Sequence, residues 1–406
     1  MRTTRSSRES ECRVHHVPRR NLNFQTSSRS KLDDTAGRRH KTHSSQLALV
    51  LILATLAALV LLPFHPPVSA EHQDATPTVR IGVLGLFHPQ QLTVTAPLGQ
   101  ALIVHANSEQ LVLEKSSGTD SATLHLSNDS VTLTAGSYTI HTPSVTITGR
   151  GVDPAAFLLS VPQKLTRRYR GTLEIRPSSG SLLAIVTMDR EIAVASVLAA
   201  ETTSDTPLEA LKAEAIAMRS YFVAGRSRHR EFDFCDTTHC QFLREPPPAM
   251  SPAANAVTAT HGLVLAYNSR PFAAMYTRSC SGRTHTAAEL HLLSSNYPYY
   301  AIECPRCRAH PVRWTTRISA TAVPNLQPLD ERARLNAVRR LGWASVPSND
   351  FIETKDGDSF ILSGVGQGHG MGLCQSGAKA MSQDGATFQQ ILAHYYPNTT
   401  IVAWPM

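Results

Sequence analysis

The stretch Thr206-Pro-Leu-Glu-Ala-Leu-Lys-Ala-Glu-Ala-Ile-Ala-Met-Arg-Ser-Tyr-Phe-Val-Ala-Gly225 predicts an amphipathic helix. It opens on a capping-box pattern, with Thr206 as N-cap, proline at the first helical position and Glu209 at the third. Gly225 suits the C-terminal end of the helix. The apolar residues that recur at intervals of three and four are Leu208, Leu211, Ala215, Met218 and Phe222.

The segment just before this helix is apolar over residues 192–200 and ends in Glu201. An apolar setting raises the pKa of a carboxyl group toward the range useful for a general acid. An acidic residue before a helix is more often a surface group that complements the helix dipole. The residues alone leave both interpretations of Glu201 open.

Residues 71–187 are expected to form a β-rich module. β-branched residues alternate or cluster at Val79–Leu84, Gln91–Thr95 and Ser144–Thr148, and turn signals such as Ser117-Gly118 separate such runs. Thr, Ser and Val stand where a site would need acids or metal ligands, so this module carries no predicted chemistry.

Residues 188–406 are expected to form a mixed α/β catalytic domain with irregular Gly-rich and Cys-containing loops. The predicted elements after Gly225 are strands at Leu263–Tyr267 and Pro271–Tyr276, a Gly-rich loop at 364–372, and helices at Gln375–Gln383 and Thr387–Tyr395. The fold class predicted for the whole chain is therefore α+β.

Charge is distributed unevenly along the 406 residues, whose formal net charge is +8. Residues 1–45 hold eleven Lys or Arg against four Asp or Glu, which gives a net charge of +7. This polar arm has no apolar period and is predicted to be disordered and cytoplasmic. Residues 71–406 carry only +1, which argues against nucleic acid as a partner.

Residues 46–70 contain no charged side chain, and Leu47 to Leu62 is an apolar run interrupted by one Thr. A short apolar run behind a basic flank is typical of a signal peptide, and Val68-Ser69-Ala70 resembles a cleavage site. The long flank instead favours an uncleaved membrane anchor. Either interpretation places residues 71–406 outside the cytoplasm, in the periplasm or cell envelope.

His229, Cys235, His239 and Cys240 form the first group with chemical potential. Two imidazoles and two thiolates match the ligand set of a closed tetrahedral zinc site. A disulfide between Cys235 and Cys240, with two incidental histidines, is the alternative.

The Gly-rich segment Gly364–Lys379 forms the second group. Its glycines alternate from 364 to 372, which allows the backbone to approach a ligand and places His369 and Gln375 at a cleft. The spacing fits neither a P-loop nor a dinucleotide-binding turn. A purely structural turn between strand and helix is the alternative.

Four further cysteines remain in the exported part: Cys280, Cys304, Cys307 and Cys374. Cys304-Pro-Arg-Cys307 is compatible with half of a metal site or with a redox pair. Two structural disulfides are equally compatible with an exported protein.

These motifs occur together in the order typical of one known family. They are Glu191–Glu201, Ala210–Arg219, Cys235–Gln241, Tyr276–Gly282, Gly368–Ala378 and His394–Pro397. The chain resembles the stage II sporulation protein D family, which also includes proteins described as amidase enhancers. The resemblance implies a peptidoglycan lytic transglycosylase or, alternatively, a non-enzymatic enhancer of a cell-wall amidase.

The resemblance implies specific roles for residues of this chain. Glu201 becomes the catalytic acid, and His229, Cys235, His239 and Cys240 become ligands of a structural zinc ion. The residues implied to bind the glycan are Gly368, His369, Gly370 and Gln375. The expected partners are peptidoglycan glycan strands, a cell-wall amidase and the membrane through the N-terminal apolar segment.

The implied reaction needs a single carboxyl group. Glu201 would protonate the glycosidic oxygen between N-acetylmuramic acid and N-acetylglucosamine. As a carboxylate it would then take the proton from the muramoyl C6 hydroxyl, which closes a 1,6-anhydro ring. A hydrolase would instead require a second acid to hold a nucleophile or a water molecule.

Overall fold

A computed structural model describes residues 77–151, 154–225, 229–293, 296–322 and 326–405. The predictions of a basic arm at 1–45 and of a signal peptide or anchor at 46–70 lie outside the described residues. None of the helices in the described part of the chain combines the length and hydropathy that a bilayer crossing requires.

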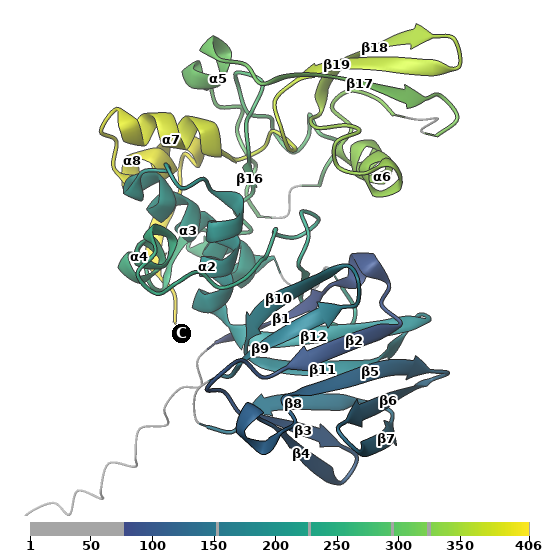
Figure 1. Cartoon of the computed structure of the whole chain (residues 1–406). Helices are drawn as coiled ribbons and strands as arrows, with labels where there is room; N and C mark the ends of the chain where they lie inside the picture. Colours follow the sequence, from purple (N-terminus) through teal and green to yellow (C-terminus); the bar gives the residue numbers. More distant parts are fainter. Residues whose placement is uncertain (1–76, 152–153, 226–228, 294–295, 323–325, 406) are drawn as a thin grey trace, which may run out of the picture. The chain divides into compact units, whose positions relative to one another are not determined.

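The first half of the described chain folds into two antiparallel sheets that face each other (Figure 1). One sheet has the order β13 (Phe234–Cys235), β1 (Thr78–Val83), β12 (Ser181–Asp189), β11 (Thr172–Ser178), β8 (Val145–Gly149), β3 (Leu102–Ala106) and β4 (Glu109–Leu113), and only β13 runs parallel to its neighbour. The other has the order β10 (Leu165–Arg170), β9 (Ala156–Val161), β2 (Gln91–Thr95), β5 (Ser121–Ser127), β6 (Ser130–Ala135) and β7 (Tyr138–Thr142). Short 3-10 turns stand at Gly85–Phe87 and Lys115–Ser117.

Alternating side chains of both sheets meet in one core. Leu92 and Val94 of β2 are fully buried, as are Leu173 and Ile175 of β11, while the residues between them are only partly buried. This period of two is the pattern that favours a sheet with one face turned to the core.

Strand β12 leads directly into the helical part. Asp189 ends β12 and caps α2 (Arg190–Glu201), because its Oδ1 accepts the N–H groups of Glu191 and Ile192 at 2.7 and 3.0 Å. The helix therefore starts from a strand fixed in the sheet, and Glu201 is its last residue.

The helix predicted at 206–225 is α3 (Leu208–Ala224), and Gly225 ends it as expected. The predicted capping box is wrong. The helix starts after Pro207, which occupies the N-cap position. The hydroxyl oxygen of Thr206 instead lies 3.1 Å from the hydroxyl oxygen of Thr203. Glu209 accepts hydrogen bonds from Lys212 and from the backbone N–H of Phe388, so its carboxylate does not reach back to Thr206.

Helix α3 is buried on both faces, whereas its sequence predicts one polar face. Leu211 and Met218 belong to the core shared with the two sheets. Ala213 and Ile216 belong to a second core, formed with the C-terminal helices. Every residue of α3 from 210 to 222 is buried except Lys212, which is partly exposed.

The buried polar residues of α3 are paired with other segments. Arg219, with a fully buried side chain, donates from Nε and Nη2 to both carboxylate oxygens of Glu191 at 2.7 and 2.6 Å. It also donates to the carbonyl oxygen of Leu263 at 3.0 Å. Ser220 Oγ accepts the N–H of Leu265 at 2.8 Å. Helix α3 is thereby held to α2 and to the strand that starts at Leu263.

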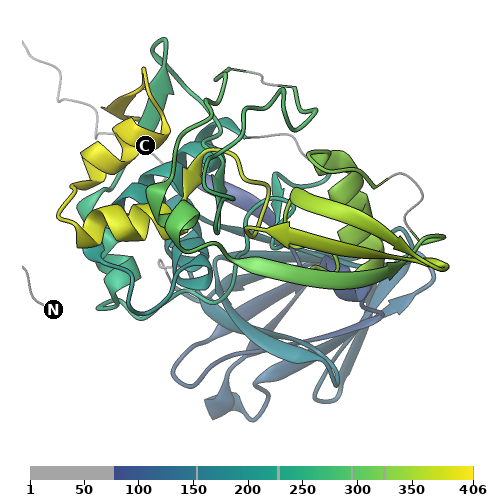
Figure 2. The same ribbon diagram turned by 90° about the horizontal axis from the view of Figure 1, so that it is seen from above.

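The remaining elements include a separate small layer (Figure 1). The elements outside that layer are α4 (Pro252–Ala259), β14 (Leu263–Tyr267), β15 (Arg270–Pro271), β16 (Tyr276–Thr277), α5 (Pro305–Ala309), β20 (Leu373–Cys374), α7 (Gln375–Gln383), α8 (Phe388–Tyr395) and β21 (Thr400–Ala403). The small layer consists of β17 (Arg313–Ser319), α6 (Glu331–Leu341), β18 (Asp350–Asp356) and β19 (Ser359–Val365). Figure 2 shows the three strands of this layer beside α6, with which they share a core of their own.

The α+β class is confirmed, and so are the strand at 263–267 and both C-terminal helices. The strand predicted at Pro271–Tyr276 is wrong. The chain there is split into β15 and β16, which pair with different partners, β14 and β20. The division of the chain at residue 188 into a module and a catalytic domain stays a prediction.

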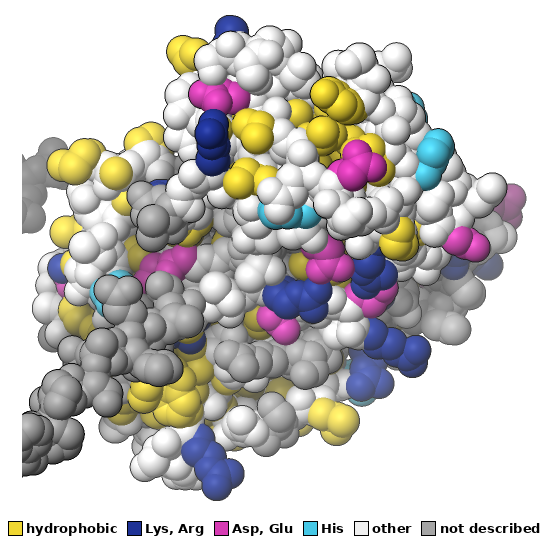
Figure 3. All heavy atoms as spheres, turned by 90° about the horizontal axis from the view of Figure 1, so that it is seen from below, with side chains coloured by type: hydrophobic (Ala, Val, Ile, Leu, Met, Phe, Trp, Pro, Cys, Tyr) yellow, Lys and Arg dark blue, Asp and Glu magenta, His cyan; other side chains and the backbone are white. Residues whose placement is uncertain are grey.

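The surface carries charges of both signs. On the face drawn in Figure 3, Lys and Arg side chains lie among Asp and Glu side chains. This mixture agrees with the small net charge of the chain beyond residue 70.

Replacing Arg219 by Leu is expected to lower the free energy of unfolding by about 3–5 kcal/mol, because Glu191 is left as an unpaired, largely buried carboxylate. Denaturant titration of the full chain measures this loss. The matched control is Arg80→Leu, whose ion pair with Glu174 is 44% and 35% exposed and is worth about 0–1 kcal/mol. Equal losses in the two variants would contradict a structural role for the buried pair.

Candidate functional site

Glu201 is held at the end of α2 by two other segments. Its Oε1 accepts the backbone N–H of Phe242 at 3.2 Å. Its backbone carbonyl accepts a hydrogen bond from Nη1 of Arg278, just after β16. The side chain is partly buried, so it remains within reach of solvent while its position is fixed.

The surroundings favour the protonated form of this carboxyl group. Burial raises the pKa of Glu201 above its ordinary value, and the hydrogen bond from Phe242 and the charges of Arg278 and Arg244 offset part of the rise. A carboxyl group with a raised pKa is suited to donate a proton near neutral pH.

A second carboxyl group that the sequence reasoning missed lies close by in α3. Glu214 is buried, and its Oε2 accepts a hydrogen bond from Nε2 of Gln375 at 2.9 Å. Burial raises the pKa of Glu214 to about 7, and the charge of Glu201 contributes to the rise. The signal was present in the sequence, since Glu214 stands three residues after Leu211 and four before Met218, on the apolar face.

Gln375, predicted from the Gly-rich segment, is the first residue of α7 and donates to Glu214, the buried carboxyl group close to Glu201. His369 contacts a different part of the chain. Its Nδ1 accepts the N–H of Met371 at 3.0 Å, and its carbonyl accepts a hydrogen bond from Asn349 at 3.1 Å. Asn349 in turn donates to Glu331 of α6 at 2.8 Å.

Gly368 and Gly370 have positive φ angles of 101° and 83°. A Cβ at Gly368 would lie 2.5 Å from Oγ1 of Thr277, and one at Gly370 would lie 2.8 Å from Cδ2 of His285. Both glycines are therefore required by close packing inside the protein.

His285, also missed by the sequence reasoning, is buried beside this loop and pairs with the partly exposed Asp350. Its Nε2 lies 2.9 Å from Oδ2 of Asp350, and its backbone N–H donates to the carbonyl of Gly370 at 2.8 Å. The pair joins the small layer around β18 to the Gly-rich segment.

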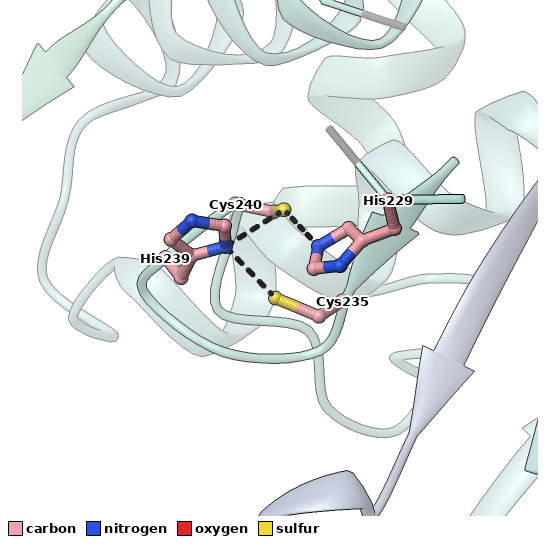
Figure 4. Close-up of side chains that lie close together, drawn as sticks. All are labelled: His229, Cys235, His239 and Cys240. Carbon is pink, nitrogen blue, oxygen red and sulfur yellow. Dashed lines mark hydrogen bonds between the residues drawn. The ribbon is translucent and has the colours of Figure 1, made fainter. Parts of the chain in front are cut away.

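The predicted zinc ligands come together. The ligand atoms of His229, Cys235, His239 and Cys240 all lie within 4.8 Å of one another. Figure 4 shows the two imidazoles and two thiols pointing toward a common centre. Nε2 of His229 lies 3.3 Å from Sγ of Cys240, and Nδ1 of His239 lies 3.7 Å from Sγ of Cys235.

The chemistry of these four residues fits a metal ion. A hydrogen bond with Cys240 lowers the pKa of the Cys235 thiol, and one with His239 adds to this effect. A lowered pKa favours the thiolate, which is the form that binds a metal. The ring of His229 is also held in place, since it stacks on Phe232 at a centroid distance of 4.4 Å.

This cluster is directly connected to the environment of Glu201. Cys240 is followed by Gln241, whose Oε1 accepts a hydrogen bond from the hydroxyl of Tyr276 at 3.0 Å, and then by Phe242. A metal ion bound at the cluster would therefore fix the backbone that donates to Glu201.

Residues 178–267, which include Glu201 and the His/Cys cluster, match the family model described as Stage II sporulation protein. The predicted resemblance to the stage II sporulation protein D family is confirmed by this match. An uncharacterized protein of Brachyspira hyodysenteriae is 27% identical over 267 residues, which are 58% of this chain and 72% of that protein. The stage II sporulation protein D of Bacillus amyloliquefaciens is 25% identical over 257 residues, which are 51% of this chain and 72% of the relative. The Bacillus subtilis amidase enhancer is 37% identical over 68 residues, 16% of this chain and 10% of the relative.

The chain has a second cluster of metal-ligand side chains, in the part beyond the segment that matches the family model. Cys280, Cys304, Cys307 and Cys374 are buried, and their Sγ atoms lie within 4.8 Å of one another. The cluster could hold a metal ion.

The raised pKa of Glu214 predicts a specific pH dependence of stability. The native carboxyl titrates near pH 7, whereas the unfolded one titrates near 4.5, so stability is lost as the pH rises from 4.5 through 7. Glu214→Gln, which keeps an acceptor for Gln375, is expected to remove this loss, on the order of 3 kcal/mol.

Urea titrations at pH 5 and pH 8 measure the difference between wild type and variant. Glu109→Gln, at an exposed position of β4, is the control and should keep the wild-type pH dependence. Parallel pH profiles for wild type and Glu214→Gln would contradict a buried, neutral Glu214.

Proposed function

We propose that this chain is a cell-envelope lytic transglycosylase of peptidoglycan, with Glu201 as its only essential acid. The observation that carries the proposal is the partly buried carboxyl group with a raised pKa, fixed at the end of α2 in the segment that matches the family model. Chain export or anchoring through residues 47–62 and binding of glycan strands belong to the same proposal.

Glu201 acts twice in the proposed reaction. Its carboxylic acid gives a proton to the glycosidic oxygen as the bond between that oxygen and muramoyl C1 breaks. The carboxylate then accepts the proton of the C6 hydroxyl, whose oxygen forms the new bond to C1. Glu201 is protonated again at the end, and no water enters the products.

The neighbouring groups support this double role. Phe242 N–H holds one carboxylate oxygen, and the charge of Arg278 stabilises the anion that forms between the two steps. Glu214, kept largely neutral below pH 7 by burial, places no full negative charge beside Glu201 at that stage. The proposed glycan-binding residues are His369, the two glycines that flank it, Gly368 and Gly370, and Gln375.

We propose Zn²⁺ as the metal at His229, Cys235, His239 and Cys240. Its chemistry there is structural, because four protein ligands leave no open coordination position. The four side chains hold the loop that leads to Phe242, and they take no part in proton transfer.

Glu201→Gln is expected to lower the release of 1,6-anhydro-muropeptides from purified glycan strands by about 10²–10⁴-fold, because the amide cannot donate or accept the proton. Mass spectrometry of the products measures this. Glu109→Gln should remain at wild-type activity. Reducing-end products from the wild type would contradict the non-hydrolytic mechanism.

Arg278→Gln is expected to move the alkaline limb of the kcat/KM profile to higher pH. The charge of Arg278 lowers the pKa of Glu201, so its removal lets the acid form persist to higher pH. Arg306→Gln, an exposed position of α5, is the control. An unchanged limb in Arg278→Gln would show that this charge does not act on Glu201.

A second candidate function is favoured by the similarity to the amidase enhancer. In this role the chain binds peptidoglycan and stimulates a cell-wall amidase without cleaving glycan itself. Stem-peptide release from cell walls by an added amidase tests it. Stimulation that is retained in Glu201→Gln, together with no glycan cleavage by the wild type, would favour the enhancer.

A further inference from the structure

We propose that Cys280, Cys304, Cys307 and Cys374 bind a second structural Zn²⁺ ion, and that they do not form two disulfides. This site is separate from the His/Cys cluster, and none of its residues takes part in the proposed reaction.

The arrangement of the sulfur atoms carries the proposal. Two disulfides require only that each sulfur approach one partner, yet here every Sγ lies within 4.8 Å of the other three. Zn–S bonds of about 2.3 Å in a tetrahedron place neighbouring sulfurs about 3.8 Å apart. Sγ of Cys307 and Sγ of Cys374 are 3.5 Å apart, close to this spacing.

The surroundings of the sulfurs suit bound thiolates. The backbone N–H of Cys280 donates to Sγ of Cys374 at 3.3 Å. Hydroxyl groups lie near two other sulfurs, Ser279 Oγ at 3.4 Å from Cys307 and Tyr395 OH at 3.7 Å from Cys304. Such donors fix metal-bound thiolates and reduce the cost of burying their charge.

The backbone also closes around the cluster. Gly377 of α7 leaves no room for a side chain, because a Cβ there would lie 2.7 Å from Sγ of Cys304 and 1.9 Å from the hydroxyl of Tyr395. Cys374 is the N-cap of α7, where the helix dipole favours a negative charge.

The ion would clamp the two segments that complete the surroundings of Glu201. Cys280 stands two residues after Arg278, and Cys374 stands directly before Gln375. The segments pair as β16 and β20, with Thr277 opposite Cys374. Cys307, on α5, belongs to neither segment, so its replacement tests the clamp without altering them.

Metal analysis of the purified full chain tests the proposal. We expect Cys307→Ser to lose one equivalent of zinc relative to wild type. Cys12→Ser, which replaces a cysteine that is not among these four, is the matched control and should lose none. Zinc content that is unchanged in a folded Cys307→Ser protein would overturn the proposal, as would iron in place of zinc.

A measurement on the wild type avoids any dependence on variant folding. The chain is denatured with a chelator but without reductant, and is then alkylated. All four cysteines should be alkylated in the resulting peptides, whereas disulfide-linked peptides among them would overturn the proposal. Loss of zinc in Cys235→Ser reports the His/Cys cluster separately, so failure at one site is distinguishable from failure at the other.

Discussion

A helix that is buried on both faces must find a partner for every polar side chain it carries, and α3 imposes this constraint on the whole described chain. Arg219 is satisfied by Glu191 of α2, Ser220 by the backbone of β14, and Glu214 by Gln375 of α7. Unpaired buried polar groups are costly. These three contacts therefore set the positions of the surrounding elements, including the helix that ends in Glu201.

The sequence was sufficient for elements whose apolar pattern is strong. Helix α3, strand β14 and the two C-terminal helices follow from periodicity alone. The layer of β17, β18, β19 and α6 escaped prediction because each of its strands has a single fully buried residue, so the strands lack the apolar alternation that marks a half-buried sheet. The N-terminus of α3 was misplaced because the carboxylate of Glu209 is bound by Lys212 and Phe388 instead of completing a capping box.

The candidate site likewise combines features that the sequence predicted with contacts that it did not. Spacing within a short loop was enough to group the two histidines and two cysteines that meet around one centre. Contacts between distant segments were not predictable in this way. The pairing of Glu214 with Gln375 spans 161 residues, and that of Arg278 with Glu201 spans 77. Glu201 itself was recognised as a candidate, but the contacts with Phe242, Arg278 and Arg244 that offset part of the rise in its pKa come from distant segments.

The pairing of β16 with β20 joins residues about a hundred positions apart, since Tyr276 lies opposite Leu373. Contacts of such long sequence separation form late, because the intervening chain must first lose its freedom. Gln375, which donates to Glu214, directly follows the paired residue Cys374. In a chain emerging in order from its N-terminus, both sheets and α2 are therefore present well before β20 and α7, and the surroundings of Glu201 are completed only after residue 375 has been made.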